Sequence, residues 1–447
     1  MNQLPLAFQD QMRLLLHEEF DTFLNCFSST GYRGIRWNSL KCDLETLQKN
    51  LPFLLEQSPF SPLSFYIPQD IERIGSLPLH HAGAFYVQEP SASSAVTVLS
   101  PKPGDHVLDL CAAPGGKSTQ IAALLDGQGL LWSNEYVKNR ANVLLSNIER
   151  MGVPNAVVSS CHPEQLCDQL AGFFDKVLVD APCSGEGMFL HDPDAVAAWT
   201  PEHVASCAVR QKGILDSAAK AVAPEGVLVY STCTYSEEEN EQVILHFLKN
   251  HPEFELLDCN VSFGRPSERL PQTRRIFPMD GGNGHFIAKL YKRDGASYTG
   301  KKYELPYKEQ DAVKAGSELY QALVTDKGQP RLLQNGMDLL LLPDELPQWS
   351  GLHILRVGVL LGMCKKNRVE PAHHFFMAVK PSALKQKVEL TSHGEAVMRF
   401  LRGEEGNVDT FLKGYVGVLV DGVTLGFGKC SGGRLKNHYP KGLRNHI

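Results

Sequence analysis

Apolar and polar positions alternate in two ways along the middle of the chain. Between residues 80 and 292, short continuous apolar runs are separated by longer stretches whose apolar side chains recur at helical spacing. Continuous runs are typical of strands buried on both faces, and the longer stretches are typical of helices. The expected strands span 106–110, 130–135, 156–160, 177–179, 227–230 and 284–293. The expected helices span 118–125, 137–152, 202–223 and 236–250. This order predicts an α/β fold with a mostly parallel, doubly wound sheet.

The segments on either side of this region have different patterns. Residues 1–78 predict a small α/β domain, with helices over 5–26 and 44–55, a strand over 34–41 and a connector over 58–78. The C-terminal part has short apolar runs broken by glycine and proline, which predicts a compact β-rich module. The expected segments are therefore an N-terminal domain (1–78), a core domain (79–293), a linker (294–310) and a C-terminal module (311–447).

Composition narrows the class of protein. No apolar run is long enough to cross a membrane, and the first residues lack the basic region of a signal peptide. The 11 cysteines are scattered without a CxxC pair, which indicates reduced thiols in a cytoplasmic protein and argues against a metal site. His80, His81, His373 and His374 have no ligand spacing either, so we expect them to be structural or to lie on the surface.

Basic residues are concentrated near the C-terminus although the net charge is −6. From residue 425 onward there are lysines and arginines but no acidic residue, and Lys365, Lys366 and Arg368 form a smaller cluster. A basic tail can serve solubility alone. The glycines and Tyr439 among these charges favour a surface that faces RNA. The basic residues of this tail are Lys429, Arg434, Lys436, Lys441 and Arg444.

A glycine-rich loop follows the first core strand in the segment LDLCAAPGGKST. Gly115 and Gly116 allow a ligand to approach the backbone closely, but neither GxGxxG nor the Walker pattern is present. Phosphate binding is therefore disfavoured relative to an adenosyl ligand. Glu135, 20 residues after Gly115, is placed to hold ribose hydroxyls, although a helix cap or a surface charge is the alternative. We expect S-adenosylmethionine rather than NAD as cofactor.

Two cysteines follow two further buried strands. Cys183 lies in LVDAPCSGEG and Cys233 in VYSTCTYSEEEN. Because ligands bind at the carboxyl ends of strands in open α/β sheets, both thiols are expected at one site. One thiol can add to C6 of a pyrimidine and so activate C5 toward a methyl group, and the other can assist. The spacing alone leaves open which thiol attacks. A lone cysteine is more often a small buried apolar residue.

These segments together resemble the NOL/NOP/Sun family of RNA cytosine-5 methyltransferases. The resemblance rests on YVQEPSA, LDLCAAPGGKSTQ, SNEYVKNRANVLLSNIERMG, DKVLVDAPCSGEGMF, RQKGIL and YSTCTYSEEENE, in the family's order, and on IRWNSLK near the N-terminus. The C-terminal module, ending in HYPKGLR, is similar to that of the bacterial RsmF/YebU branch, which modifies 16S ribosomal RNA. The resemblance implies a Rossmann-like S-adenosylmethionine methyltransferase core and a PUA-like C-terminal module.

The resemblance also implies roles for individual residues. Cys233 is the expected nucleophile, Cys183 assists product release, and Asp180 contacts the cytosine edge and the cofactor. His162 falls about where many relatives carry an aspartate, so its contact to the cofactor is a departure from the pattern. The expected cofactor-binding residues are Cys111, Ala112, Ala113, Pro114, Gly115, Gly116, Lys117, Glu135, Arg140, His162 and Asp180.

Three functions compete at this point. The first is methylation of cytosine C5 in 16S rRNA, with the RNA or the 30S subunit as partner and the chain acting as a monomer. The second keeps the chemistry but acts on tRNA. The third is a non-catalytic RNA-binding factor in ribosome assembly, which the two cysteine motifs and the glycine loop argue against.

Overall fold

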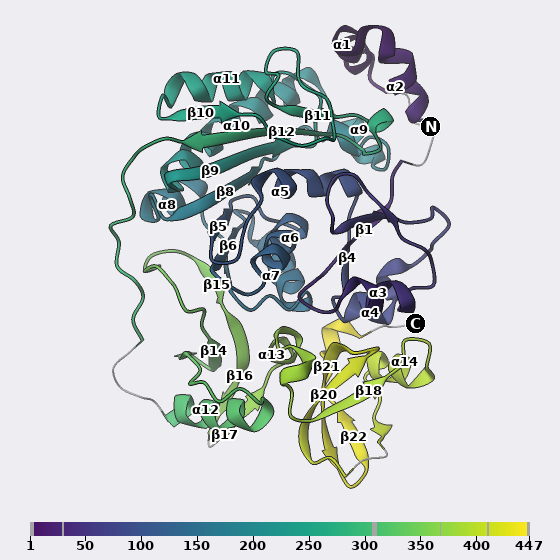
Figure 1. The fold of residues 1–447 in the computed structure, drawn as a ribbon, viewed down its shortest axis with the longest axis vertical. Helices are drawn as coiled ribbons and strands as arrows, with labels where there is room; N and C mark the ends of the chain where they lie inside the picture. The colour runs from purple at the N-terminus through teal and green to yellow at the C-terminus, as the bar shows by residue number, and fades with distance from the viewer. Residues whose placement is uncertain (1–3, 29–30, 306–310, 367, 409–410, 445–447) are drawn as a thin grey trace.

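The computed structural model describes residues 4–28, 31–305, 311–366, 368–408 and 411–444. A nine-stranded mixed sheet forms its centre, in the order β10-β12-β9-β8-β5-β6-β7-β15 with β11 paired to β12 (Figure 1). Its parallel strands are β5 (His106–Asp109), β6 (Leu130–Asn134), β7 (Ala156–Ser159), β8 (Phe174–Asp180) and β9 (Val222–Thr232). Its antiparallel strands are β10 (Phe254–Leu257), β11 (Arg274–Ile276), β12 (His285–Lys292) and β15 (Ile354–Val357).

Helices cover both faces of this sheet. Along β8, Val177 and Val179 point to one apolar core and Leu178 points to the other, so this strand contributes side chains to two cores. Continuous apolar runs are the result, as expected for a sheet buried on both sides. The first core is shared with α8 (Pro163–Gln169), α10 (Pro201–Ala221) and α11 (Glu241–Asn250). The second is shared with α5 (Ser94–Leu99), α6 (Gly116–Leu125) and α7 (Lys138–Arg150). The predicted doubly wound α/β core is confirmed.

A small antiparallel sheet precedes the core, in the order β2-β3-β1-β4. The predicted helix over 44–55 is shorter, because Pro52 cannot continue it and α3 (Leu44–Asn50) ends before that residue. The predicted connector over 58–78 contains a strand of this sheet. The last strand of the small sheet lies beyond the expected domain boundary at residue 78, and that boundary stays a prediction. The strands are β1 (Gly34–Trp37), β2 (Glu56–Gln57), β3 (Ser64–Tyr66) and β4 (Phe85–Val87), and the short helix α4 (Pro78–His81) precedes β4.

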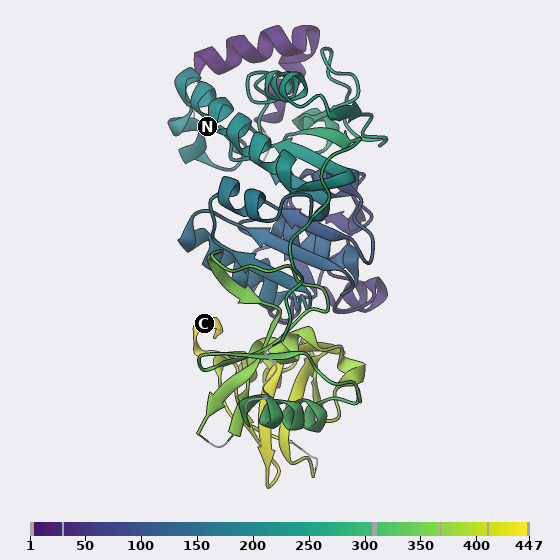
Figure 2. The ribbon, with the colours of Figure 1, turned by 90° about the vertical axis from the view of Figure 1, so that its left-hand side faces the viewer.

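The first two helices lie apart from this sheet, at the opposite end of the molecule from the C-terminal module (Figure 2). The expected single helix over 5–26 is α1 (Leu6–Leu16) and α2 (Phe20–Cys26), joined by one 3₁₀ turn. Phe8 packs on Phe189 with ring centroids 5.0 Å apart, and Phe23 meets Tyr235 edge-on at 5.5 Å. Phe189 lies in the loop after β8, which carries Cys183, and Tyr235 lies in the loop after β9, which carries Cys233. The N-terminal helices therefore support these loops.

The C-terminal part contains two sheets. The first has the order β13-β14-β16-β17 and packs with α12 (Asp311–Leu323) and α13 (His373–Ala378). Its strands are β13 (Leu332–Asn335), β14 (Asp338–Leu341), β16 (Val359–Lys365) and β17 (Arg368–Pro371). The second has the order β18-β20-β21-β22-β19. Its strands are β18 (Lys387–Leu390), β19 (Gly406–Asn407), β20 (Gly414–Val420), β21 (Val423–Ser431) and β22 (Arg434–Asn437), accompanied by α14 (Glu395–Arg402).

Two connections tie this C-terminal part to the rest of the chain. β15, expected within the C-terminal module, instead pairs antiparallel with β7 and extends the central sheet. The second C-terminal sheet shares one apolar core with the N-terminal sheet, in which Ile35 and Phe85 pack with Val418. Within the described residues, no helix is long and apolar enough to cross a membrane.

Candidate functional site

The two cysteines lie side by side at the carboxyl edge of the central sheet. β8 and β9 are parallel neighbours, with Asp180 paired to Ser231, so the loops after them emerge together. The sulfur atoms of Cys183 and Cys233 are 3.4 Å apart. Both thiols are partly exposed, and both line the same cavity. The adjacency of these strands explains why residues 50 positions apart meet.

The surroundings of Cys183 favour its protonated form. The contact with Cys233 and then burial raise the pKa of Cys183 well above its usual range. Cys183 therefore keeps its proton beside the second sulfur atom.

A buried glutamate positions the Cys183 loop. Glu239 accepts hydrogen bonds from the Ser184 amide at 2.9 Å, from the Ser184 hydroxyl and from Gln211 Nε2 at 2.8 Å. Burial raises the pKa of Glu239. The expected helix over 236–250 begins later in the structure, because α11 begins at Glu241, so Glu239 precedes the helix. Glu239 instead ties the Cys183 loop to α10.

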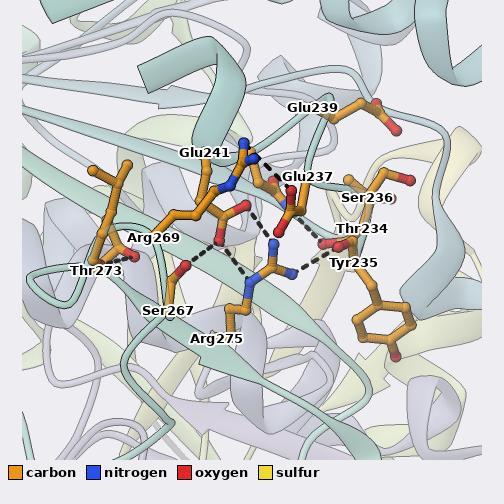
Figure 3. A network of polar contacts seen from close by, with 12 residues as sticks. Thr234, Tyr235, Ser236, Glu237, Glu239, Glu241, Ser267, Arg269, Thr273 and Arg275 are labelled. Atoms are coloured by element: carbon orange, nitrogen blue, oxygen red, sulfur yellow. Dashed lines mark hydrogen bonds and ion pairs between the residues drawn. The ribbon is translucent and has the colours of Figure 1, made fainter. Parts of the chain in front are cut away.

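Two further carboxylates position the Cys233 loop. Glu186 is fully buried and accepts from the Tyr235 amide at 2.6 Å and the Ser236 amide at 3.0 Å. Glu241 forms a buried pair with Arg275, whose Nη1 donates to the Tyr235 carbonyl at 2.7 Å (Figure 3). The segment after Cys233 is thus held from two sides. Sequence patterns did not indicate these supporting residues.

Asp180 forms an ion pair at the start of the Cys183 loop. Its Oδ2 lies 2.7 Å from Lys117 Nζ, and its Oδ1 accepts from the Ser231 hydroxyl at 2.8 Å. The Lys117 side chain is only 11% exposed, so it is not a solvated helix start. Burial alone would lower the pKa of Lys117, but the Asp180 carboxylate outweighs it and the pKa is raised. Lys117 thus stays charged beside the thiols.

The glycine-rich loop runs from β5 into α6. Gly115 has φ +114°, and a Cβ there would lie 3.2 Å from Leu144 Cδ1, so only glycine fits without strain. Arg36 of β1 is fully buried and donates to the Gly116 carbonyl at 3.0 Å and to Thr119 Oγ1 at 2.6 Å. The N-terminal sheet therefore positions this loop, through an arginine that the sequence analysis did not identify.

Glu135, which follows β6, lies on the other side of the glycine-rich loop. Glu135 accepts from the Val137 amide at 2.9 Å, and its Oε2 lies 3.3 Å from Arg140 Nη1. Arg140 also donates to the Ala113 carbonyl at 3.1 Å, so it links the acid to the loop. His162 is exposed at the start of α8, with its ring 5.4 Å from that of Tyr136.

The thiols, Asp180, Glu135 and Arg140 all line one cavity of about 1010 Å³. Several expected site residues line it, whereas Ala112, Pro114, Gly115, Gly116 and Lys117 do not. Burial raises the pKa of the Cys111 thiol well above its usual range, so it forms a neutral wall. The expected residues in the lining are Cys111, Ala113, Glu135, Arg140, His162, Asp180, Cys183 and Cys233. Further residues in the lining include Tyr136, Met188, Val209, Arg210 and Gly213.

Across the described ranges, no group of three or more histidine, cysteine, aspartate or glutamate side chains could hold an ion. Burial lowers the pKa of His80, His373 and His374 to about 3, so these rings are neutral packing residues.

Family models match four consecutive parts of the chain. Residues 96–291 match the 16S rRNA methyltransferase RsmB/F domain, and residues 4–90 match the N-terminal domain of 16S rRNA methyltransferase RsmF. Residues 318–379 match the first C-terminal domain of the RsmF rRNA methyltransferase, and residues 386–445 match its PUA domain. The C-terminal sheets therefore correspond to two separate family domains, the second of which is the expected PUA-like module.

Individual relatives agree with these models. Ribosomal RNA small subunit methyltransferase F from Vibrio vulnificus is 32% identical over 98% of this chain and 97% of its own length. A methyltransferase homologue from Pyrococcus horikoshii has a crystal structure that is 31% identical, with a TM-score of 0.57, over 64% of this chain and 94% of that one. The structure of NSun6 from the same organism with SFG is 24% identical, covers 65% and 99%, and supports the fold with a TM-score of 0.59.

Proposed function

Since the chain belongs to the RsmB/F family of 16S rRNA methyltransferases, we propose that it methylates C5 of a cytosine in 16S rRNA through a covalent bond from Cys233 to C6. The observation that carries the proposal is the 3.4 Å contact between two thiols in a cavity that also holds Asp180. The proposed setting is the cytoplasm, with a single copy of the chain acting on the RNA or the 30S subunit.

S-adenosylmethionine is the cofactor of this family, and the residues present fit it. The cavity offers a carboxylate for ribose hydroxyls at Glu135, an exposed ring at Tyr136 and apolar walls at Ala113 and Pro182. When bound, the cofactor supplies an electrophilic methyl group on a sulfonium.

The chain's own residues and one water molecule account for the remaining chemistry. The Cys233 thiolate adds to C6 of cytosine, and the electron pair of the C5–C6 double bond moves to make C5 nucleophilic. C5 then takes the methyl group. A water molecule takes the C5 proton, the electron pair of the C5–H bond forms the C5–C6 double bond again, and the Cys233–C6 bond breaks with its electron pair leaving on the sulfur as the thiolate. Cys183, 3.4 Å from the leaving sulfur, is placed to assist that release.

Asp180 is proposed to stabilise the ring during the addition. Its carboxylate is oriented by Lys117 and Ser231, and it lines the cavity beside both thiols. As a carboxylate it accepts hydrogen bonds, so its proposed partner is the amino group on the cytosine edge. A preoriented group of this kind is worth more than one that must reorganise, and Lys117 keeps the carboxylate in one position.

Methylation of 30S subunits tests this function directly. The full chain with radiolabelled S-adenosylmethionine is expected to place label in 16S rRNA, as 5-methylcytidine after digestion to nucleosides. Bisulfite sequencing then locates the protected cytosine. Label in tRNA but not in 16S rRNA would support the tRNA alternative instead, and label on any base other than cytosine would contradict the proposal.

Replacing Glu135 tests the cofactor assignment. Glu135→Gln removes a charged acceptor, and hydrogen bonds to charged groups contribute about 1.5–3 kcal/mol, so S-adenosylmethionine affinity should fall about 10- to 100-fold. Isothermal titration calorimetry measures this change. The control is Glu164→Gln, an exposed carboxylate lining the same cavity. Equal losses in both variants would contradict a specific role for Glu135.

A further inference from the structure

The mouth of the cavity has features that cofactor binding and the thiol chemistry leave unused. Met188 and Val209 line it, and their side chains are 45% and 71% exposed although they are apolar. Arg210 lies next to Val209, is exposed, and has no ion-pair partner among the described residues. Gly213, one helical turn further along α10, also lines the cavity.

The backbone beneath these side chains is rigid. The Gly187 amide donates to the Cys233 carbonyl at 2.8 Å, so Met188 follows a residue bonded directly to the proposed nucleophile. Gln211, next to Arg210, is fully buried and donates to the Pro182 carbonyl at 3.1 Å and to Glu239 at 2.8 Å. Exposed apolar groups on a rigid frame at a cavity mouth are suited to binding a partner.

Gly213 adds an independent observation. It lies within α10, where glycine is less favourable than alanine, yet a Cβ built there meets nothing within 4 Å. The protein itself gives no steric reason for this glycine. The open space beside it belongs to the cavity, so a ligand approaching the bare helix wall explains it.

We propose that Met188, Val209, Arg210 and Gly213 form a docking platform for the single-stranded nucleotides that flank the target cytosine. The apolar faces of Met188 and Val209 contact bases, the Arg210 guanidinium neutralises one phosphate, and Gly213 lets the RNA backbone come close. This inference rests on the proposed function and names the part of that site that receives RNA. A target base must leave its stack to reach the thiols, and its displaced neighbours need a surface of this kind.

Single substitutions in the full chain test the platform. Met188→Ala and Val209→Ala should each weaken binding of a 16S rRNA fragment about tenfold, and Arg210→Gln should reduce the slope of log affinity against log salt by about one. Fluorescence anisotropy measures binding without turnover, so it tests the platform even if methylation fails. S-adenosylmethionine affinity should be unchanged. The controls are Val143→Ala and Lys249→Gln, exposed residues outside the cavity.

Gly213→Ala separates a contact role from a structural one. The free protein should melt slightly higher, because alanine favours the helix and its Cβ meets no atom. RNA affinity should nevertheless fall at least about threefold, because the added methyl group fills the approach. Unchanged RNA affinity in all four variants would overturn the platform. The platform would also be overturned if these variants bound S-adenosylmethionine more weakly but bound RNA normally. Absence of methylation by a wild-type chain that binds RNA normally would count against the proposed function alone.

Discussion

Cys233→Ala is expected to lower methyl transfer at least about 10⁴-fold, because it removes the sulfur that is proposed to add to C6. Cofactor affinity should stay within about twofold, since the cavity keeps its shape when a thiol becomes a methyl group. Cys183→Ala should behave differently. Attack by Cys233 survives, but release slows, so a covalent protein–RNA complex should accumulate and resist denaturing electrophoresis.

The double variant makes this comparison decisive. Cys183→Ala combined with Cys233→Ala should form no adduct, because the adduct depends on the Cys233 sulfur. Cys364→Ala, in β16 and outside the cavity, is the matched control and should retain full activity. An adduct that persists in the double variant, or one that appears in Cys233→Ala alone, would contradict the assigned roles.

Arg275→Met is expected to lower the free energy of unfolding by about 3–5 kcal/mol, the range found when one partner of a buried pair is removed. The Glu241 side chain is fully buried and would lose its counter-charge, together with the bond from Arg275 to the Tyr235 carbonyl (Figure 3). Urea denaturation followed by tryptophan fluorescence measures the loss. Activity should also fall, because the segment after Cys233 loses a support.

The same network supplies a matched control. Arg269 pairs with Glu237 at 3.6 Å, but its side chain is 55% exposed (Figure 3). Exposed pairs contribute about 0–1 kcal/mol, so Arg269→Met should change stability little. Arg275→Met combined with Glu241→Gln should recover part of the loss, because no unpaired charge then stays buried. Equal effects of Arg275→Met and Arg269→Met would contradict this account of the network.

The sequence was most informative where chemistry depends on local pattern. Apolar runs indicate the parallel strands, and the rule that sites form at their carboxyl ends predicts that Cys183 and Cys233 share one site. The pattern was least informative where distant segments meet. Arg36 reads as an ordinary strand residue, and only the fold reveals that it bonds to the Gly116 carbonyl.

Two contacts could not be predicted for this reason. β15 lies in the segment that matches the first C-terminal domain, but nothing local to Ile354–Val357 indicates that its partner is β7. Glu239 fell inside the expected helix over 236–250, whereas α11 begins at Glu241. The burial of Glu239 against Ser184 and Gln211 depends on packing between α10 and the loops. Tertiary contacts between remote segments carry this information, and helical or strand periodicity does not.

The pairing of β7 with β15, and the core shared by the first and last sheets, have a consequence for synthesis of the protein. A ribosome must release residue 357 before the edge of the catalytic sheet is covered, and residue 418 before Ile35 meets its partners near Val418. Folding during translation therefore leaves an uncovered strand edge for many seconds, at about 5–20 residues per second. Each contact forms only after its C-terminal strand, β15 or β20, has been synthesised.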